Sequence, residues 1–241
     1  MSDHPAFHTT RWSLIARAAQ DSSPESRAAL EELCDLYWYP LYAFVRREGV
    51  SPDEAQDLTQ GFFVSLLERQ DLRAVHEEKG RFRSFLRTSM KHFLLNYWKH
   101  NRAQKRGGGN KLMSLDFEVA EQRYSREPEL TPDQLFDRQW ALTVLDLAMA
   151  ALEESYFKQG KEQLFLKLKP ALTGASDSAT GVEVAERLSM SEGAVRTALH
   201  RLRKDFRTEL RRQVAETLDE SENTSLDEEI SYLFAALNPG T

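Results

Sequence analysis

The chain reads GVEVAERLSMSEGAVRTALHRLRK over residues 181–204. Apolar residues recur there at three- and four-residue steps on both sides of Ser189-Met190, which is typical of two helices joined by a tight turn. The predicted inward positions are Val184, Leu188, Val195, Ala198 and Leu202. Ala185 lies where the helices would cross, and its small side chain lets them approach. The pattern predicts a helix-turn-helix in which Ser189 replaces the usual turn glycine.

The second helix of this pair has a polar and basic outer face. Its side chains are donors and acceptors that suit base edges and phosphates in a DNA major groove. The candidates are Arg196, Thr197, His200, Arg201, Arg203 and Lys204. The alternative is an ordinary helical hairpin with a solvated basic face. The small residue at the crossing, the tight turn and the basic face agree, and together they favour DNA binding.

Charge is distributed unevenly along the 241 residues, whose formal net charge is −6. Residues 81–111 hold nine Lys or Arg and no acid, and residues 191–212 hold seven against three acids. Residues 213–241 hold seven acids and no base. Because salt screens charges beyond about 10 Å, a polyanion near either basic segment would feel mainly that segment. The acidic average therefore does not argue against nucleic-acid binding.

Helical periodicity continues through nearly the whole chain, which predicts an all-α fold of two helical domains joined by a flexible linker. The predicted domains are 1–106, a linker 107–131, a second domain 132–218 and an acidic tail 219–241. The predicted helices are 10–19, 24–48 with a kink at Pro40 and an end at Gly49, 51–69, 80–104, 131–152, 161–172, 180–188, 191–218 and 225–237. Cys34 falls among apolar helical positions, so we expect a buried thiol.

Two of these helices have compositions that point beyond simple packing. Residues 80–106 interleave cations with Phe, Tyr and Trp, the ingredients for binding single-stranded DNA; the alternative is that every ring is core. Residues 51–69 are apolar on more than one face, so the helix is either deeply buried or docks a partner. Gly61 in its middle costs about 1 kcal/mol and would permit close approach by another backbone.

Three segments, taken in order, resemble the sigma-70 family of bacterial transcription initiation factors, and the extracytoplasmic-function (ECF) type in particular. DEAQDLTQGFFVSLLE over 53–68 resembles region 2.2, which docks on RNA polymerase. RFRSFLRTSMKHFLLNYWKHNRAQ over 81–104 resembles regions 2.3 and 2.4, which melt and read the minus-10 element. Residues 191–204 resemble the recognition helix of region 4.2, which reads the minus-35 element. No segment resembles region 3 or region 1.1.

The resemblance implies an alternative sigma factor that binds core RNA polymerase, through its beta-prime clamp helices and beta flap, and promoter DNA. An anti-sigma factor or other regulator is a further partner that it allows. The implied polymerase-binding residues are Asp57, Leu58, Gln60, Phe62 and Phe63. The implied minus-10 residues are Arg81, Arg83, Lys91, Asn96, Lys99 and Arg102, and the implied minus-35 residues are the six named above. Gly61 and Ala198 depart from the family pattern, so neither the polymerase contact nor the minus-35 sequence carries over directly.

Other function classes have little support. The six histidines and one cysteine show no metal-ligand spacing, and Gly107–Gly109 is not followed by the residues of a phosphate loop. We therefore expect no enzyme activity, cofactor or metal.

No apolar run is long enough for a membrane span and no signal peptide is evident, which predicts a cytoplasmic protein without membrane insertion. The main alternative is a helix-turn-helix regulator that does not bind core polymerase, but it leaves residues 53–104 unexplained.

The acidic tail ends in a predicted amphipathic helix that starts at the capping box Ser225–Glu228. The simplest expectation is that this helix packs on one of the domains, and the alternative is that it binds a regulator. A third possibility is that the tail folds back on the basic helix and competes with DNA.

Overall fold

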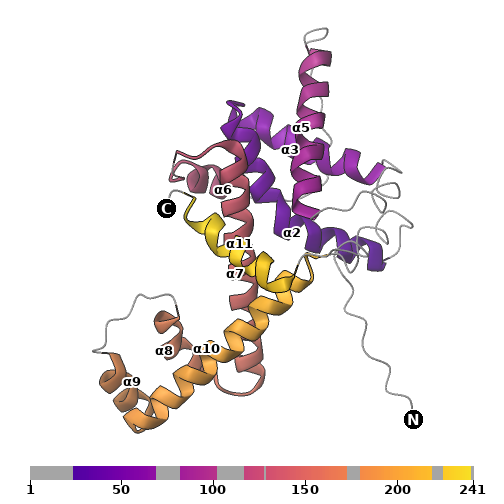
Figure 1. The fold of residues 1–241 in the computed structure, drawn as a ribbon. Coiled ribbons are helices and arrows are strands. Elements are labelled where there is room, and N and C mark those ends of the chain that lie inside the picture. Colours follow the sequence, from indigo (N-terminus) through magenta and orange to yellow (C-terminus); the bar gives the residue numbers. More distant parts are fainter. Residues whose placement is uncertain are drawn as a thin grey trace, which may run out of the picture. The chain divides into compact units, whose positions relative to one another are not determined.

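The computed structural model describes residues 24–68, 82–101, 117–127, 129–172, 180–218 and 225–239. Across these ranges the regular elements are helices, without a strand, which confirms the predicted all-α fold (Figure 1). The predicted helix over 10–19 lies outside the described residues. The chain forms two compact units: residues 1–143 together with 214–241 make the first, and residues 144–213 make the second.

Helices of the first unit begin and end where the sequence provides caps. The bounds are α2 Pro24–Arg47, α3 Pro52–Glu68, α5 Phe82–Asn101, α6 Phe117–Tyr124, the start of α7 Pro132–Lys158, and α11 Leu226–Leu237. Thr131 Oγ1 accepts a hydrogen bond from the Gln134 N–H at 3.3 Å, and Ser225 with Glu228 forms the predicted capping box. Helix α2 is followed by Gly49, whose φ of +87° is a left-handed conformation that glycine adopts without strain.

The core of the first unit is built mainly from aromatic side chains. Tyr37 and Phe44 of α2, Phe82 of α5, and Phe136 and Trp140 of α7 are all fully buried. Tyr37 meets Phe82 edge to face at 5.3 Å between ring centroids, a favourable geometry for aromatic pairs. Burial of rings from three helices fixes how α5 lies against α2 and α7. Cys34 is also buried, as predicted.

Helix α6 lies within residues 107–131, which the sequence pattern predicts to be a linker, so the prediction of a linker is wrong for this helix. Glu121 of α6 accepts hydrogen bonds from Arg46 Nε at 2.9 Å and from Tyr42 Oη at 2.7 Å. The Arg46 guanidinium holds the pKa of the Glu121 carboxyl below its usual range. The Phe117 ring packs edge-on against Trp38. An eight-residue helix is too short to be stable alone, so these contacts with α2 hold it.

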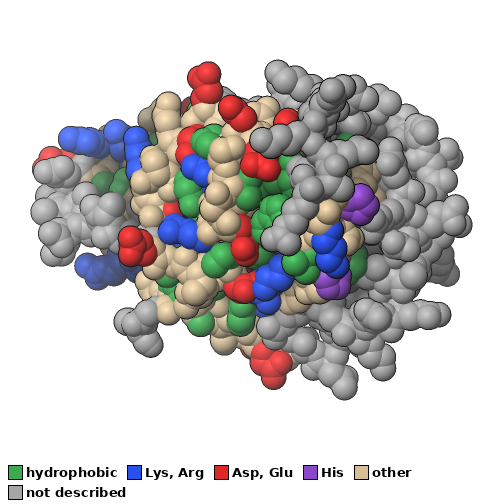
Figure 2. Space-filling view, turned by 90° about the horizontal axis from the view of Figure 1, so that it is seen from above, with side chains coloured by type: hydrophobic (Ala, Val, Ile, Leu, Met, Phe, Trp, Pro, Cys, Tyr) green, Lys and Arg blue, Asp and Glu red, His purple; other side chains and the backbone are tan. Residues whose placement is uncertain are grey.

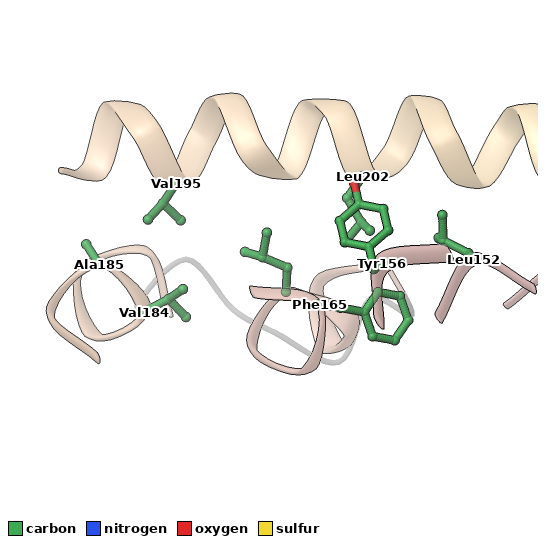
Figure 3. Packing of buried hydrophobic residues seen from close by; sticks show 8 residues of the cluster. Leu152, Tyr156, Phe165, Val184, Ala185, Val195 and Leu202 are labelled. Carbon is green, nitrogen blue, oxygen red and sulfur yellow. The ribbon is translucent and has the colours of Figure 1, made fainter. Parts of the chain in front are cut away.

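The second unit packs the remaining part of α7 with α8 Glu162–Leu168, the 3₁₀ helix η2 Lys169–Ala171, α9 Thr180–Leu188 and α10 Glu192–Ala215. Its core draws Val195 and Leu202 of α10 against Ala185 of α9 and Phe165 of α8 (Figure 3). Tyr156 Oη donates a hydrogen bond to Asp205 Oδ2 at 2.9 Å, which ties α7 to α10. The long helix α10 is therefore held by contacts with α7, α8 and α9.

The unit boundary falls inside α7 because the first turns of that helix bond to α5, as described below. The domain limits predicted at residues 106, 131 and 218 were placed by the sequence pattern and not by such contacts. They stay a prediction.

Candidate nucleic-acid interfaces

The turn between α9 and α10 has the geometry of a Schellman motif, the common helix C-terminus that needs a left-handed residue. The Met190 N–H donates to the Ala185 carbonyl at 2.9 Å, and the Ser189 N–H donates to the Glu186 carbonyl at 3.2 Å. Ser189 has a φ of +52°. Serine therefore occupies the position where the sequence analysis noted a missing glycine. The bonds fix the direction in which the chain enters α10.

Helix α10 separates an inner apolar face from an outer polar face. Val195 and Leu202 are buried and Ala198 is partly buried, which confirms their predicted inward orientation. All six predicted minus-35 residues are exposed: Arg196, Thr197, His200, Arg201, Arg203 and Lys204. The Ser191 side chain caps the helix by accepting from the Ala194 N–H at 3.2 Å. The structure thus brings these six residues onto the solvent side of one rigid helix, as DNA readout requires.

Helix α5 exposes a mixed surface in its C-terminal half. The predicted minus-10 residues Lys91, Asn96 and Lys99 are exposed. Leu95 and Trp98 beside them are 50% and 37% exposed. An exposed indole next to cations is suited to stacking on an unpaired base. Among the predicted minus-10 residues, Arg81 and Arg102 lie outside the described part of the chain.

The aromatic residues of α5 do not all serve the core. Phe82 is buried, whereas Phe85, Phe93 and Tyr97 are partly buried and Trp98 is exposed. This distribution answers a question that the sequence left open, because the rings of this helix fall on several faces.

Arg83, another predicted minus-10 residue, is buried rather than exposed. Only 4% of its surface is accessible, and its guanidinium forms an ion pair with Glu229 of α11. Its Nε lies 3.8 Å from Asp137 Oδ1 of α7. The guanidinium carbon lies 4.6 Å from the Trp140 ring centroid and 4.1 Å from the Tyr232 ring centroid. In this arrangement Arg83 cannot reach a DNA strand, and its predicted contact with the minus-10 element stays a prediction.

The next two cations of α5 are also paired with acids of α7. Arg87 donates to Asp137 Oδ2 at 2.7 Å, and its Nε lies 3.2 Å from Asp133 Oδ1. Lys91 Nζ lies 2.8 Å from Asp133 Oδ1. Figure 2 shows Lys and Arg side chains lying directly beside Asp and Glu side chains at several places on the face drawn. Sequence reasoning missed Asp133, Asp137 and Glu229 as functional candidates.

Most of the predicted polymerase-binding residues belong to the core of the first unit. Leu58, Phe62 and Phe63 are each 3% exposed, and Gln60 is 8% exposed. Asp57 is the member of the predicted set that lies exposed. These apolar residues of α3 are thus buried in the core and not available on the surface. A polymerase contact through them stays a prediction. The surface that α3 offers is acidic, formed by Asp53 and Asp57.

Gly61 lies under an aromatic ring and not under another backbone. A Cβ atom added at Gly61 would meet Phe93 Cζ at 3.5 Å, an ordinary van der Waals distance. Among the described residues, the expected close approach of another backbone is therefore not found at Gly61, and their packing does not require the glycine.

A family model described as ECF sigma factor matches residues 28–212 of the chain. The chain belongs to the ECF sigma factor family. The match includes α3, α5, α7 and α10 up to residue 212, so the described residues of each candidate interface lie inside it. Comparison with curated proteins and with solved structures gives no match. As an ECF sigma factor, the protein is a member of a family of non-enzymatic factors that act in transcription initiation.

Two further observations on this sigma factor concern membrane-spanning helices and metal-binding clusters. No helix in the described ranges has the length and apolar character needed to cross a membrane. Within the same ranges, His, Cys, Asp and Glu side chains form no cluster of three or more that could hold a metal ion.

The α11 helix lies outside the family match, which ends at residue 212. Its Glu229 and Tyr232 nevertheless contact Arg83 and Asp137, which lie within the match. The tail of this ECF sigma factor is thus packed against the family core.

Proposed function

We propose that this ECF sigma factor binds core RNA polymerase and directs promoter-specific initiation, with α10 reading the minus-35 duplex and α5 binding the minus-10 strand. The observation that carries the proposal is the surface of α10, where the six predicted contact residues are exposed and the apolar residues between them are buried or partly buried. A helix with that division can enter a major groove without giving up its packing.

The α5 helix supports the second half of the proposal. Lys91 and Lys99 supply cations along one exposed stretch, and Trp98 supplies a ring between them. Lysines neutralise phosphates whatever the sequence, whereas a ring stacks on a base that has left the duplex. These groups therefore suit a strand that has been opened, which is what the minus-10 element becomes during initiation. The acidic outer surface of α3, around Asp57, is our candidate for the polymerase contact.

Run-off transcription with purified core polymerase, the full-length chain and genomic DNA fragments tests the proposal. We expect specific transcripts that depend on the chain. Footprinting on the resulting promoter should show two protected patches about two helical turns apart. DNA binding without transcription and without co-purification with core polymerase would instead support a regulator that does not act through polymerase.

A matched pair of variants tests the role of α10. Arg196→Ala should weaken promoter binding by about 1–3 kcal/mol and relax specificity at one position, as expected for an arginine that reads a base. Lys204→Ala should weaken binding to all promoters alike and reduce the salt dependence, as expected for a phosphate contact. Lys158→Ala is the control, because Lys158 is an exposed cation on α7 of the same unit, paired with Glu154. Equal losses in all three variants would contradict the assignment.

A further inference from the structure

Acids from two distant parts of the chain converge on the basic side of α5. Glu229 comes from α11, and Asp133 and Asp137 come from the start of α7. Together they pair with Arg83, Arg87 and Lys91, which follow one another at four-residue spacing on α5 and so lie along one face of that helix. The described residues of α5 contain no acid of their own. This face is therefore basic in sequence and neutralised in the structure.

The contact around Arg83 is the most enclosed of the three. Glu229 is fully buried, and the Tyr232 ring of α11 and the Trp140 ring of α7 both lie against the guanidinium. Tyr232 Oη also donates a hydrogen bond to Asp137 Oδ2 at 2.7 Å. A buried guanidinium must have compensating charge and hydrogen bonds. Here α11 supplies a carboxylate and an aromatic ring to Arg83. A bound DNA strand would supply a phosphate and a base in their place.

The covering helix is also suited to detachment. α11 has 12 residues, and a helix of that length is marginal in water without tertiary contacts. Its buried residues are Glu229, Leu233 and Ala236, while Phe234 on its outer side is 52% exposed. Tertiary contacts therefore hold α11 in place, and those of Glu229 and Tyr232 involve the same Arg83 that the minus-10 interface would use.

We propose that α11, together with Asp133 and Asp137 of α7, is an autoinhibitory cover that competes with promoter DNA for the basic face of α5. The proposal rests on the proposed function, because it assigns α5 to the minus-10 strand. In the covered state carboxylates occupy the positions that phosphates would take. Binding of DNA to Arg83 requires that α11 leaves, so the affinity for DNA is reduced by the fraction of molecules that are covered.

The test uses full-length chain with core polymerase and, as probe, a fluorescent single-stranded oligonucleotide from the minus-10 region of a promoter found by run-off transcription. Glu229→Gln removes the buried carboxylate and should raise affinity for this strand about tenfold by lowering the covered fraction. Asp227→Asn is the matched control, since it removes one charge from an exposed position of the same helix, and it should change affinity by less than about twofold.

Tyr232→Phe is a second variant, which keeps the ring over Arg83 and removes the hydrogen bond to Asp137. It should raise affinity in the same direction by a smaller factor. Hydrogen exchange of the α11 amides provides an independent readout of the cover. We expect faster exchange in Glu229→Gln without DNA, and faster exchange in the wild type once the strand is bound.

Two results would overturn the cover while leaving the proposed function intact. One is a wild-type complex in which α11 amides stay protected with the strand bound. The other is a Glu229→Gln variant whose α11 exchanges faster but whose affinity is unchanged or reduced. If neither the wild type nor a variant lacking residues 219–241 binds the strand or supports transcription with core polymerase, the proposed function itself fails, and the cover with it.

Discussion

Ser189 is the residue whose replacement gives the sharpest test of the helix-turn-helix geometry. Its φ of +52° places an L-residue with a side chain in the left-handed region, at the C-terminal turn of α9. That conformation costs a non-glycine residue about 1–2 kcal/mol. Glycine would remove this strain. It would also increase the conformational entropy of the unfolded chain, which lowers the free energy of unfolding by about 0.5–1 kcal/mol. Ser189→Gly should therefore stabilise the second unit by about 0.5–1 kcal/mol.

The chain contains its own reference for this substitution at the end of α7. The Lys161 N–H donates to the Tyr156 carbonyl and the Gly160 N–H donates to the Phe157 carbonyl, both at 2.9 Å. This is the same pair of bonds as at Ser189, and Gly160 has a φ of +69°. Among the described residues, no atom lies within 4 Å of a Cβ placed on Gly160, so the expected cost of a serine there is backbone strain. Gly160→Ser should therefore destabilise the second unit by a similar amount.

Hydrogen exchange of the full-length protein measures both effects, in peptides from residues 144–213. We expect exchange about two- to fivefold slower in Ser189→Gly and faster by a similar factor in Gly160→Ser. Ser189→Ala separates the backbone from the hydroxyl, because it keeps the Cβ and should leave the rate unchanged. Faster exchange in Ser189→Gly would refute the reasoning, because the relief of backbone strain would then be smaller than the entropy that glycine gains in the unfolded chain.

Two further predictions follow from single contacts. Gly61→Ala should stabilise the first unit by up to about 1 kcal/mol, because alanine favours the helix and the added methyl group meets Phe93 Cζ at an unstrained 3.5 Å. Urea unfolding followed by tryptophan fluorescence measures this change in stability. A lower urea midpoint would show that the Phe93 ring cannot accept the methyl group. The pKa of Tyr156 is raised to about 12 by burial and by its hydrogen bond to Asp205. The folded state thus holds the phenol proton more tightly than the unfolded state, whose pKa is about 10. The resulting stabilisation is fully present below pH of about 10 and is lost as the pH rises towards 12. In Tyr156→Phe the alkaline loss of stability should be smaller, and identical alkaline unfolding curves would contradict the shift.

The sequence predicted those parts of the fold that depend on local pattern. Starts of helices were predicted at Thr131 and Ser225 because a capping side chain lies within its own first turn. The inner and outer faces of α10 were predicted because a period of about 3.6 residues assigns each position to a side. These signals do not need knowledge of any distant residue.

Helix α6 shows where such reasoning fails. Its eight residues are a mixture of polar and apolar types, and no capping signal in the sequence marks its start. The helix exists through Glu121, whose partners Arg46 and Tyr42 lie 75 and 79 positions away. The faces of α3 were undecided for a related reason, because Phe62 reads as core or as docking surface until Phe93 is placed against it.

By itself the sequence determined that this protein is helical, that it has a helix-turn-helix with a basic outer face, and that its segments follow the order found in ECF sigma factors. The tertiary structure alone decided which cations remain available. Arg83 and Lys99 look equivalent in the sequence of α5, yet Glu229, 146 positions away, encloses the first and leaves the second exposed. Helical period is a local property of the chain, whereas the partner of a charge depends on which distant segments the fold brings within a few ångströms.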